Sequence, residues 1–169
     1  MNASSQTPAK TQNSHEEVRP DELLMRRILP RKKDYHPSRT PSIQETAFWP
    51  RPNDVEGLSL SRRRTAENSH FLDENQFKAA CSHPDANLRL RCGVCAVLVA
   101  AAQAIGLQVR PDPIIPDDPG HVYLPDINYL DFDRSPESRQ KILIWVGQLI
   151  EIASQNILIL PGTSLQQTE

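Results

Sequence analysis

The 169-residue sequence predicts a mixed fold of the α+β or α/β class, with one small central sheet and two main helices. Short segments that alternate apolar and polar residues are typical of strands, and two long apolar segments, 92–105 and 135–155, are typical of helices. Fifteen prolines and a hydrophobic fraction of 38% indicate long, stiffened loops around a modest core. We therefore expect a single domain of ordinary size.

The ends of the chain differ from its middle in composition. Residues 1–19 are polar and lack apolar periodicity, so we expect a disordered tail there. Residues 20–162 should form the single domain, which begins with an extended basic segment over 20–64. A loose tail should follow over 163–169.

The first half of the domain predicts few regular elements. Residues 20–30 predict a short helix, because acidic residues at its start and arginines at its end suit the helix dipole. The proline-punctuated stretch 31–57 should run extended over the surface. Residues 58–62 alternate and predict a strand, and 69–80 predict a weaker helix.

The centre of the chain holds the strongest apolar signal. Residues 87–91 alternate and predict a short strand. Residues 92–105 are rich in alanine and long for a strand, so they predict a buried helix that Gly106 ends. A strand over 107–109 should then lead into a proline-rich loop.

The last third predicts a strand, a helix and a final strand. Residues 121–127 predict the first strand. The clearest helix covers 135–155, with Ser135 as N-cap and Pro136 as the first helical residue. Residues 157–160 predict a buried strand.

Charge is distributed unevenly although the formal net charge is only −2. Residues 1–64 carry a net charge of +4 and residues 65–169 a net charge of −6. Such asymmetry favours either an acidic partner for the first half or an intramolecular contact between the halves.

The basic residues suggest the leading functional hypothesis. We expect a non-enzymatic accessory or adaptor protein, without a cofactor, that binds an acidic surface of another protein. The partner-binding residues would be Arg26, Arg27, Arg31, Lys32 and Lys33. The same residues could neutralise phosphates, so a nucleic-acid-associated protein is an alternative.

Three features of the sequence indicate the cellular compartment. No apolar run reaches the roughly 18–20 residues of a membrane span, and the amino terminus lacks the apolar stretch of a secretory signal. An odd number of cysteines does not suggest a disulfide framework. We therefore expect a cytoplasmic protein without membrane partners.

The cysteines allow a metal site. The residues Cys81, His83, Cys92 and Cys95 have ligand types that suit tetrahedral zinc. However, the last two run directly into an apolar segment, so packing in the core is the favoured interpretation.

A thiol hydrolase is the alternative enzyme hypothesis. A thiol at a helix start is acidified by the dipole, and a histidine on a later strand could take its proton. Cys92, His121 and Asp126 follow that order, which resembles papain-like and cell-wall-peptidase hydrolases over residues 90–127. The resemblance implies these three residues as the catalytic set.

A second resemblance covers residues 22–125. The segments "LLMRRILP", "GLSLSR" and "GLQVRPDPIIPDDPGHVYL" resemble a group of small uncharacterised bacterial proteins. The resemblance implies no activity, but it favours the packing interpretation of the cysteines. It singles out six residues: Arg26, Arg27, Ser61, Asp112, Pro113 and His121.

Overall fold

The computed structural model describes residues 17–36 and 42–162. The tail predicted over 163–169 and most of that predicted over 1–19 lie outside the described residues. Residues 17–19 lie inside them, and Arg19 forms ion pairs with Asp21 and Glu22. Helices and strands are mixed around a central sheet, which confirms the mixed fold class.

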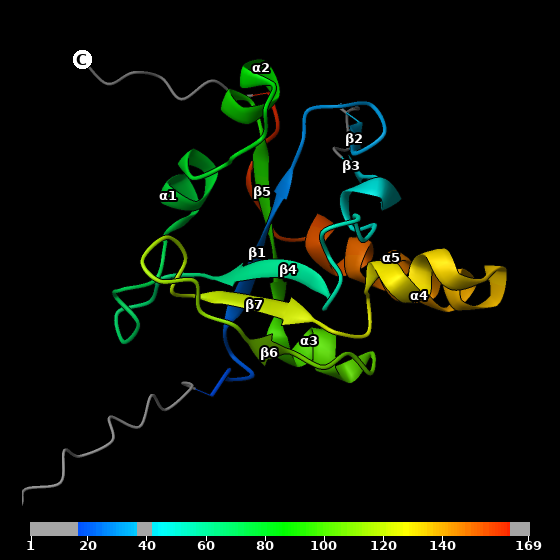
Figure 1. Cartoon of the computed structure of the whole chain (residues 1–169). Helices are drawn as coiled ribbons and strands as arrows, with labels where there is room; N and C mark the ends of the chain where they lie inside the picture. Colours follow the sequence, from blue (N-terminus) through cyan, green and yellow to red (C-terminus); the bar gives the residue numbers. More distant parts are fainter. Residues whose placement is uncertain (1–16, 37–41, 163–169) are drawn as a thin grey trace, which may run out of the picture.

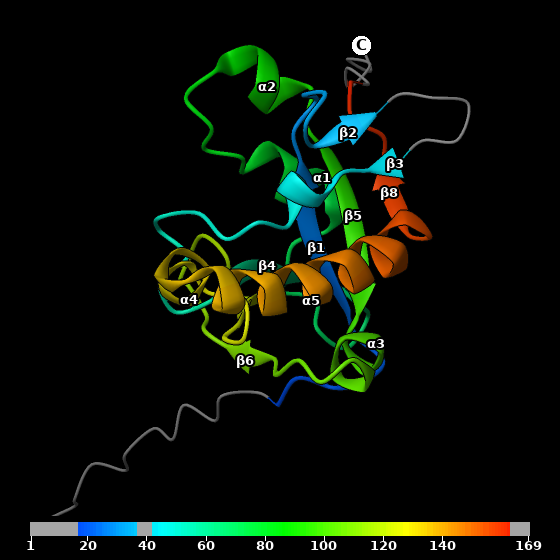
Figure 2. The ribbon, with the colours of Figure 1, turned by 90° about the vertical axis from the view of Figure 1, so that its right-hand side faces the viewer.

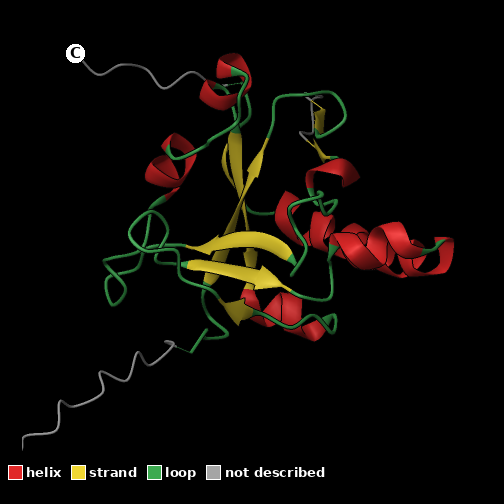
Figure 3. Ribbon diagram, viewed as in Figure 1, coloured by secondary structure: helices red, strands yellow, loops and turns green. Residues whose placement is uncertain are grey.

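The sheet has six antiparallel strands in the order β6-β7-β4-β1-β5-β8 (Figures 1 and 3). A separate pair of two-residue strands forms a small hairpin beside it. The strands are β1 Leu23–Ile28, β2 Tyr35–His36, β3 Ser42–Ile43, β4 Leu58–Arg62, β5 Gly93–Leu98, β6 Arg110–Pro111, β7 His121–Leu124 and β8 Ile157–Ile159.

Helices cover both faces of the sheet. In Figure 2 the long helix α5 crosses the front of the sheet, with α1 behind β1. The main core lies between α5 and the sheet, and a smaller cluster of Met25, Phe77 and Val94 lies on the α1 side. The helices are the 3₁₀ turn η1 Glu45–Ala47, α1 Glu74–Ala79, α2 Ala86–Leu90, α3 Val99–Ala104, α4 Tyr129–Arg134 and α5 Pro136–Ser154.

Several predicted elements are confirmed. The strands β4, β7 and β8 lie where the sequence predicted them, although β7 and β8 are shorter than predicted and β8 is half-buried rather than buried. Helix α5 begins as expected, because the Oγ atom of Ser135 accepts a hydrogen bond from the Ser138 amide at 3.1 Å and Pro136 is the first helical residue. Helix α1 is the six-residue core of the helix predicted over 69–80.

The helix predicted over 20–30 is wrong, because this segment is the central strand β1. Leu24 and Ile28 are four residues apart, a spacing that places two side chains on one face of either a helix or a strand. In the structure they share the α5 face, and Met25 between them faces α1.

Two further predictions near the centre are corrected. Residues 87–90 belong to α2, with Arg91 as its C-cap, rather than to a strand, because Asp85 caps the amides of Asn87 and Leu88. The helix predicted over 92–105 divides into strand β5 and the short helix α3. Only one main helix therefore remains, and 107–109 precede the two-residue strand β6 without forming a strand.

Strands β1 and β4 separate soon after they pair. Their register holds only Leu24 opposite Arg62 and Met25 opposite Ser61, whereas β1 pairs with β5 over its full six residues. In Figure 1, β4 and β7 run across the picture while β1 and β5 run up it. Past Met25 a gap therefore opens between β1 and β4, and Arg26 and Arg27 lie at its edge.

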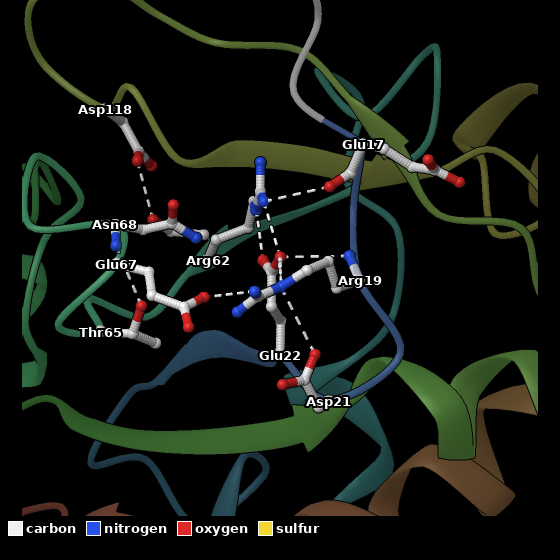
Figure 4. A network of polar contacts seen from close by, with 10 residues as sticks. Glu17, Arg19, Asp21, Glu22, Arg62, Thr65, Glu67, Asn68 and Asp118 are labelled. Carbon is white, nitrogen blue, oxygen red and sulfur yellow. Dashed lines mark hydrogen bonds and ion pairs between the residues drawn. The ribbon is translucent and has the colours of Figure 1, made fainter.

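A buried ion pair fastens the paired end of the two strands. Arg62, at the end of β4, donates a 2.7 Å hydrogen bond to Glu22, which precedes β1 (Figure 4). Both residues are buried. The guanidinium of Arg62 also lies over the Phe71 ring at 4.5 Å. This pair holds the strands together on one side of the gap.

Candidate functional site

A cleft lies beside α1, where β1 separates from β4. It has two adjoining compartments, of about 580 Å³ and 320 Å³, which share Arg27, Ser59, Phe77 and Ser82 as lining residues. We call the whole hollow the twin-arginine cleft. Its larger, acidic compartment is also lined by Asp117, Asp118 and His121, and its smaller, basic compartment by Arg26, Arg51 and His83.

Arg27 lies where the two compartments meet. Its Nε atom donates to the carbonyl oxygen of Phe77 at 2.9 Å, and its guanidinium lies 4.0 Å from the centre of the Phe77 ring. Burial lowers the pKa of Arg27, since the surroundings disfavour its charge. Helix α1 therefore fixes this side chain by its stem and Nε atom and leaves the end of the guanidinium free.

Arg26 points to the other face of β1 and bridges the gap to β4. Its Nε atom donates to the Ala47 carbonyl at 3.1 Å, and its Nη1 atom donates to the Ser59 carbonyl at 2.8 Å. The second bond takes the place of a ladder bond that the separated strands do not make. Burial lowers the pKa of Arg26, mainly by desolvation.

In the part of the chain that the structure describes, neither arginine has a carboxylate partner. Among residues 17–36 and 42–162, no ion pair joins Arg26 or Arg27 to an acidic side chain within 4.0 Å. A guanidinium has five N–H donors, of which Arg27 uses one and Arg26 two. Within the described residues, the Nη2 atom of Arg26 and both Nη atoms of Arg27 have no hydrogen-bond partner, and both side chains line the basic compartment.

Other groups of the basic compartment add positive charge and a donor. Arg51 lies close enough to Arg26 to lower its pKa further by repulsion. Asp54 offsets part of this charge, but its carboxylate already accepts the Arg51 amide at 2.8 Å. His83 accepts the Asp85 amide on Nδ1 at 3.1 Å, which leaves its proton on Nε2.

The acidic compartment presents hydrogen-bond acceptors. Asp118 accepts the Ser61 hydroxyl on Oδ1 at 2.7 Å, and burial raises the pKa of Asp118. Nδ1 of His121 lies 2.9 Å from the carbonyl oxygen of Asp112 and 3.2 Å from its carboxylate. Two acceptors at Nδ1 fix the imidazole with its proton on that atom, so Nε2 is left as an acceptor.

The predicted zinc ligands do not converge. Cys92 and Cys95 are three residues apart on an extended segment, so their side chains point to opposite faces. Cys95 lies in the main core, whereas Cys92 lies in a cluster with Cys81 and Leu29. Among the residues that the structure describes, no three metal-ligating side chains could hold an ion. All three cysteines are buried and free.

The predicted hydrolase residues also lie apart. Cys92 leads into β5 rather than a helix, and His121 begins β7, with β1 and β4 between them. Neighbouring strands are about 4.8 Å apart, so the thiol does not reach the imidazole. Asp126 instead accepts the Gln108 amide at 2.7 Å, and Asp112 orients His121.

The predicted partner-binding residues divide into three groups. Arg26 and Arg27 line the cleft. Arg31 forms an ion pair with the buried carboxylate of Asp34. Lys32 and Lys33 are exposed on the turn that leads to β2.

Residues far apart in the sequence meet at the cleft. Five of the six residues that the second resemblance singles out contact the cleft or hold a side chain that lines it: Arg26, Arg27, Ser61, Asp112 and His121. Sequence reasoning missed Asp118 as a site residue. Its neighbourhood "PDDPGH" signals a turn, but nothing in the sequence places that turn beside β1.

Comparisons with protein-family models, with curated proteins and with solved structures find no match to this chain. Over residues 17–36 and 42–162, none of the helices has the length and apolar character needed to cross a membrane. The geometry and the charge of the cleft are therefore the basis for a proposed function.

Proposed function

We propose that the protein binds a small phosphorylated ligand in the twin-arginine cleft, with the phosphate between Arg26 and Arg27. One observation carries the proposal: two desolvated guanidinium groups face a cleft without a carboxylate partner. Desolvating a charge is costly unless an opposite charge compensates. An oxyanion that accepts charge-assisted hydrogen bonds from both arginines would supply that compensation.

The other arginines of the basic segment support this reasoning by contrast. Arg31, Arg62 and Arg63 each contact a carboxylate, on Asp34, Glu22 and Glu74 respectively. These three arginines are therefore neutralised inside the protein. Within the described residues, Arg26 and Arg27 form no such ion pair, and both line a cavity.

The charge of the basic compartment favours phosphate over a single carboxylate. Arg26, Arg27 and Arg51 together carry three positive charges, and Asp54 and Cys81, whose pKa is lowered, offset part of them. The balance stays positive, and a phosphate monoester carries more negative charge at neutral pH, about −1.5 to −2, than a carboxylate does. The compartment volumes lie within the range of about 300–1,000 Å³ that small-molecule sites occupy.

The expectation that the basic segment docks on an acidic protein surface stays a prediction. Of its five residues, only Lys32 and Lys33 are exposed, and the recessed arginines favour a small ligand. The double variant Lys32→Glu, Lys33→Glu separates the two ideas, because it should leave phosphate binding in the cleft unchanged.

Isothermal titration calorimetry with inorganic phosphate tests the proposal. Arg27→Gln removes the charge at the meeting point of the compartments, so phosphate affinity should fall about tenfold or more, the usual effect of losing a charged hydrogen bond. The matched control Arg63→Gln removes an arginine that already has Glu74 as its partner and should bind phosphate like the wild type.

The proposal fails under either of two results. One is the absence of phosphate binding to the wild-type protein in low-salt buffer. The other is equal phosphate affinity of the wild type and Arg27→Gln. Melting curves of both variants without phosphate show whether they are folded.

A further inference from the structure

The acidic compartment indicates what the rest of the ligand looks like, on the premise that the proposed phosphate site is correct. Opposite Arg27, the turn between Asp117 and His121 presents acceptor atoms to the cavity. Oδ1 of Asp118 accepts the Ser61 hydroxyl, and the backbone of Gly120 contributes a further hydrogen bond to this carboxylate. A carboxylate accepts about four hydrogen bonds and donates none when it is charged, so it has room for further donors. A ligand that fills this compartment must therefore bring donors.

We infer that the ligand is a phosphate ester of a polyhydroxylated compound, such as a sugar phosphate or a ribonucleotide. Its phosphate would lie in the basic compartment and its hydroxyl groups against Asp117, Asp118 and His121. A carboxylate that accepts hydrogen bonds from sugar hydroxyls is a recurrent way to hold ribose. Here two carboxylates and the Nε2 atom of His121 offer several acceptors side by side.

Hydroxyl donors fit this wall better than an ammonium group. Arg27 already lies close enough to Asp118 to stabilise its charge. A ligand cation would face Arg27 across the same compartment and be repelled by it. A neutral hydroxyl carries no such penalty.

The remaining surface of the compartment suits the carbon skeleton of such a ligand. The apolar side chains of Leu60, Leu72, Phe77 and Ile114 line it between the acceptors. Alternating apolar surface and a few fixed polar groups is the usual composition of a small-molecule site. The site thus offers one anion-binding end and one hydroxyl-binding end.

The test compares affinities for three probes: inorganic phosphate, ribose 5-phosphate and butyl phosphate. The wild type should bind ribose 5-phosphate about tenfold tighter than butyl phosphate, because a few hydrogen bonds separate the two esters. In Asp118→Asn this preference should largely disappear while the affinity for inorganic phosphate stays the same. Asparagine keeps an oxygen that accepts the Ser61 hydroxyl, so the turn should stay folded.

A second variant and a fourth ligand complete the test. If Asp118→Asn does not fold, the exposed Asp117→Asn replaces it with the same expectation. Adenosine 5′-monophosphate compared with ribose 5-phosphate shows whether the natural source is a nucleotide or a sugar phosphate.

The inference and the proposed function can fail separately. Equal binding of ribose 5-phosphate and butyl phosphate, or tighter binding of phosphoethanolamine than of both, would overturn the inference alone, provided that inorganic phosphate binds. Failure of inorganic phosphate to bind the wild type would overturn the proposed function as well.

Discussion

Arg26 and Arg27 are neighbours in sequence but are held by different parts of the fold. Arg27 is held by the Phe77 ring and carbonyl, and Arg26 by the carbonyls of Ala47 and Ser59. Each therefore keeps a defined orientation without an ion pair. Preorganised donors of this kind bind an anion without first losing side-chain entropy.

Asp118 should lower stability while it serves binding. Burial raises its pKa, so the charged carboxylate is unfavourable at neutral pH in the folded state. This penalty grows as pH rises above the ordinary carboxyl pKa of about 3.9 and is absent below it. Asp118→Asn should therefore be at least as stable as the wild type at pH 7.

Urea unfolding of both proteins at pH 7 and at pH 3 checks this expectation. The stability advantage of Asp118→Asn at pH 7 should vanish at pH 3, where both states of the wild type are protonated. A variant that is less stable than the wild type by the same amount at both pH values would show that Asp118 is a structural residue only.

Cys81 should be the reactive thiol of the three. A hydrogen bond from Cys92 lowers the pKa of Cys81 to about 5, and the charges of Arg27 and His83 act in the same direction. Burial raises the pKa of Cys95 to about 12, and the pKa of Cys92 is raised by its bond to Cys81. Iodoacetamide at pH 7 should therefore label Cys81 first.

Because Cys81 also lines the basic compartment, phosphate should slow its alkylation. Mass spectrometry of the folded protein, with and without phosphate, measures both effects. Faster labelling of Cys92 or Cys95, or a rate at Cys81 that phosphate does not change, would contradict this assignment.

Strands β1 and β4 are joined at one end and open at the other, and Glu22 and Arg62 form the join. Both are buried, so removing the carboxylate leaves a buried cation without its opposite charge. Glu22→Gln should cost about 3–5 kcal/mol of unfolding free energy.

Urea denaturation measures the loss. The control Glu67→Gln removes a carboxylate that pairs with Arg19 at the surface and should cost less than about 1 kcal/mol. Equal losses in the two variants would mean that the buried pair does not fasten the strands.

Helices and strands could be predicted where the residues that determine them lie within the element's own sequence. Helix α5 carries its cap, its proline and its apolar stripe within its own sequence, and β4 alternates between turns. The central strands β1 and β5 were not predictable, because buried strands lack alternation and resemble buried helix segments. Their identity depends on partners that are distant in the chain.

The candidate site shows the same division. The excess of basic residues in the first half of the sequence indicated Arg26 and Arg27 as binding residues. It did not indicate that both side chains line a cleft. The cleft results from the separation of β1 from β4, together with the position of the 112–121 loop beside α1. Neither is encoded within a window of neighbouring residues.

The molecule as a whole neutralises the charge asymmetry of its sequence. Ion pairs from Arg63 to Glu74, from Arg64 to Asp73 and from Arg19 to Glu67 join the basic half to the acidic half. The intramolecular alternative raised by the charge distribution is therefore realised in part. Among the described residues, Arg26, Arg27 and Arg51 take no part in these ion pairs, and all three line the cleft.

The central claim is that an oxyanion occupies the space between the two unpaired arginines. A crystal structure of the protein grown with tungstate, an oxyanion located by its anomalous scattering, tests this most directly. We expect tungstate within hydrogen-bond distance of the Nη atoms of Arg26 and Arg27. An ion pair between Arg27 and Asp117 or Asp118, with tungstate bound elsewhere or not at all, would contradict it.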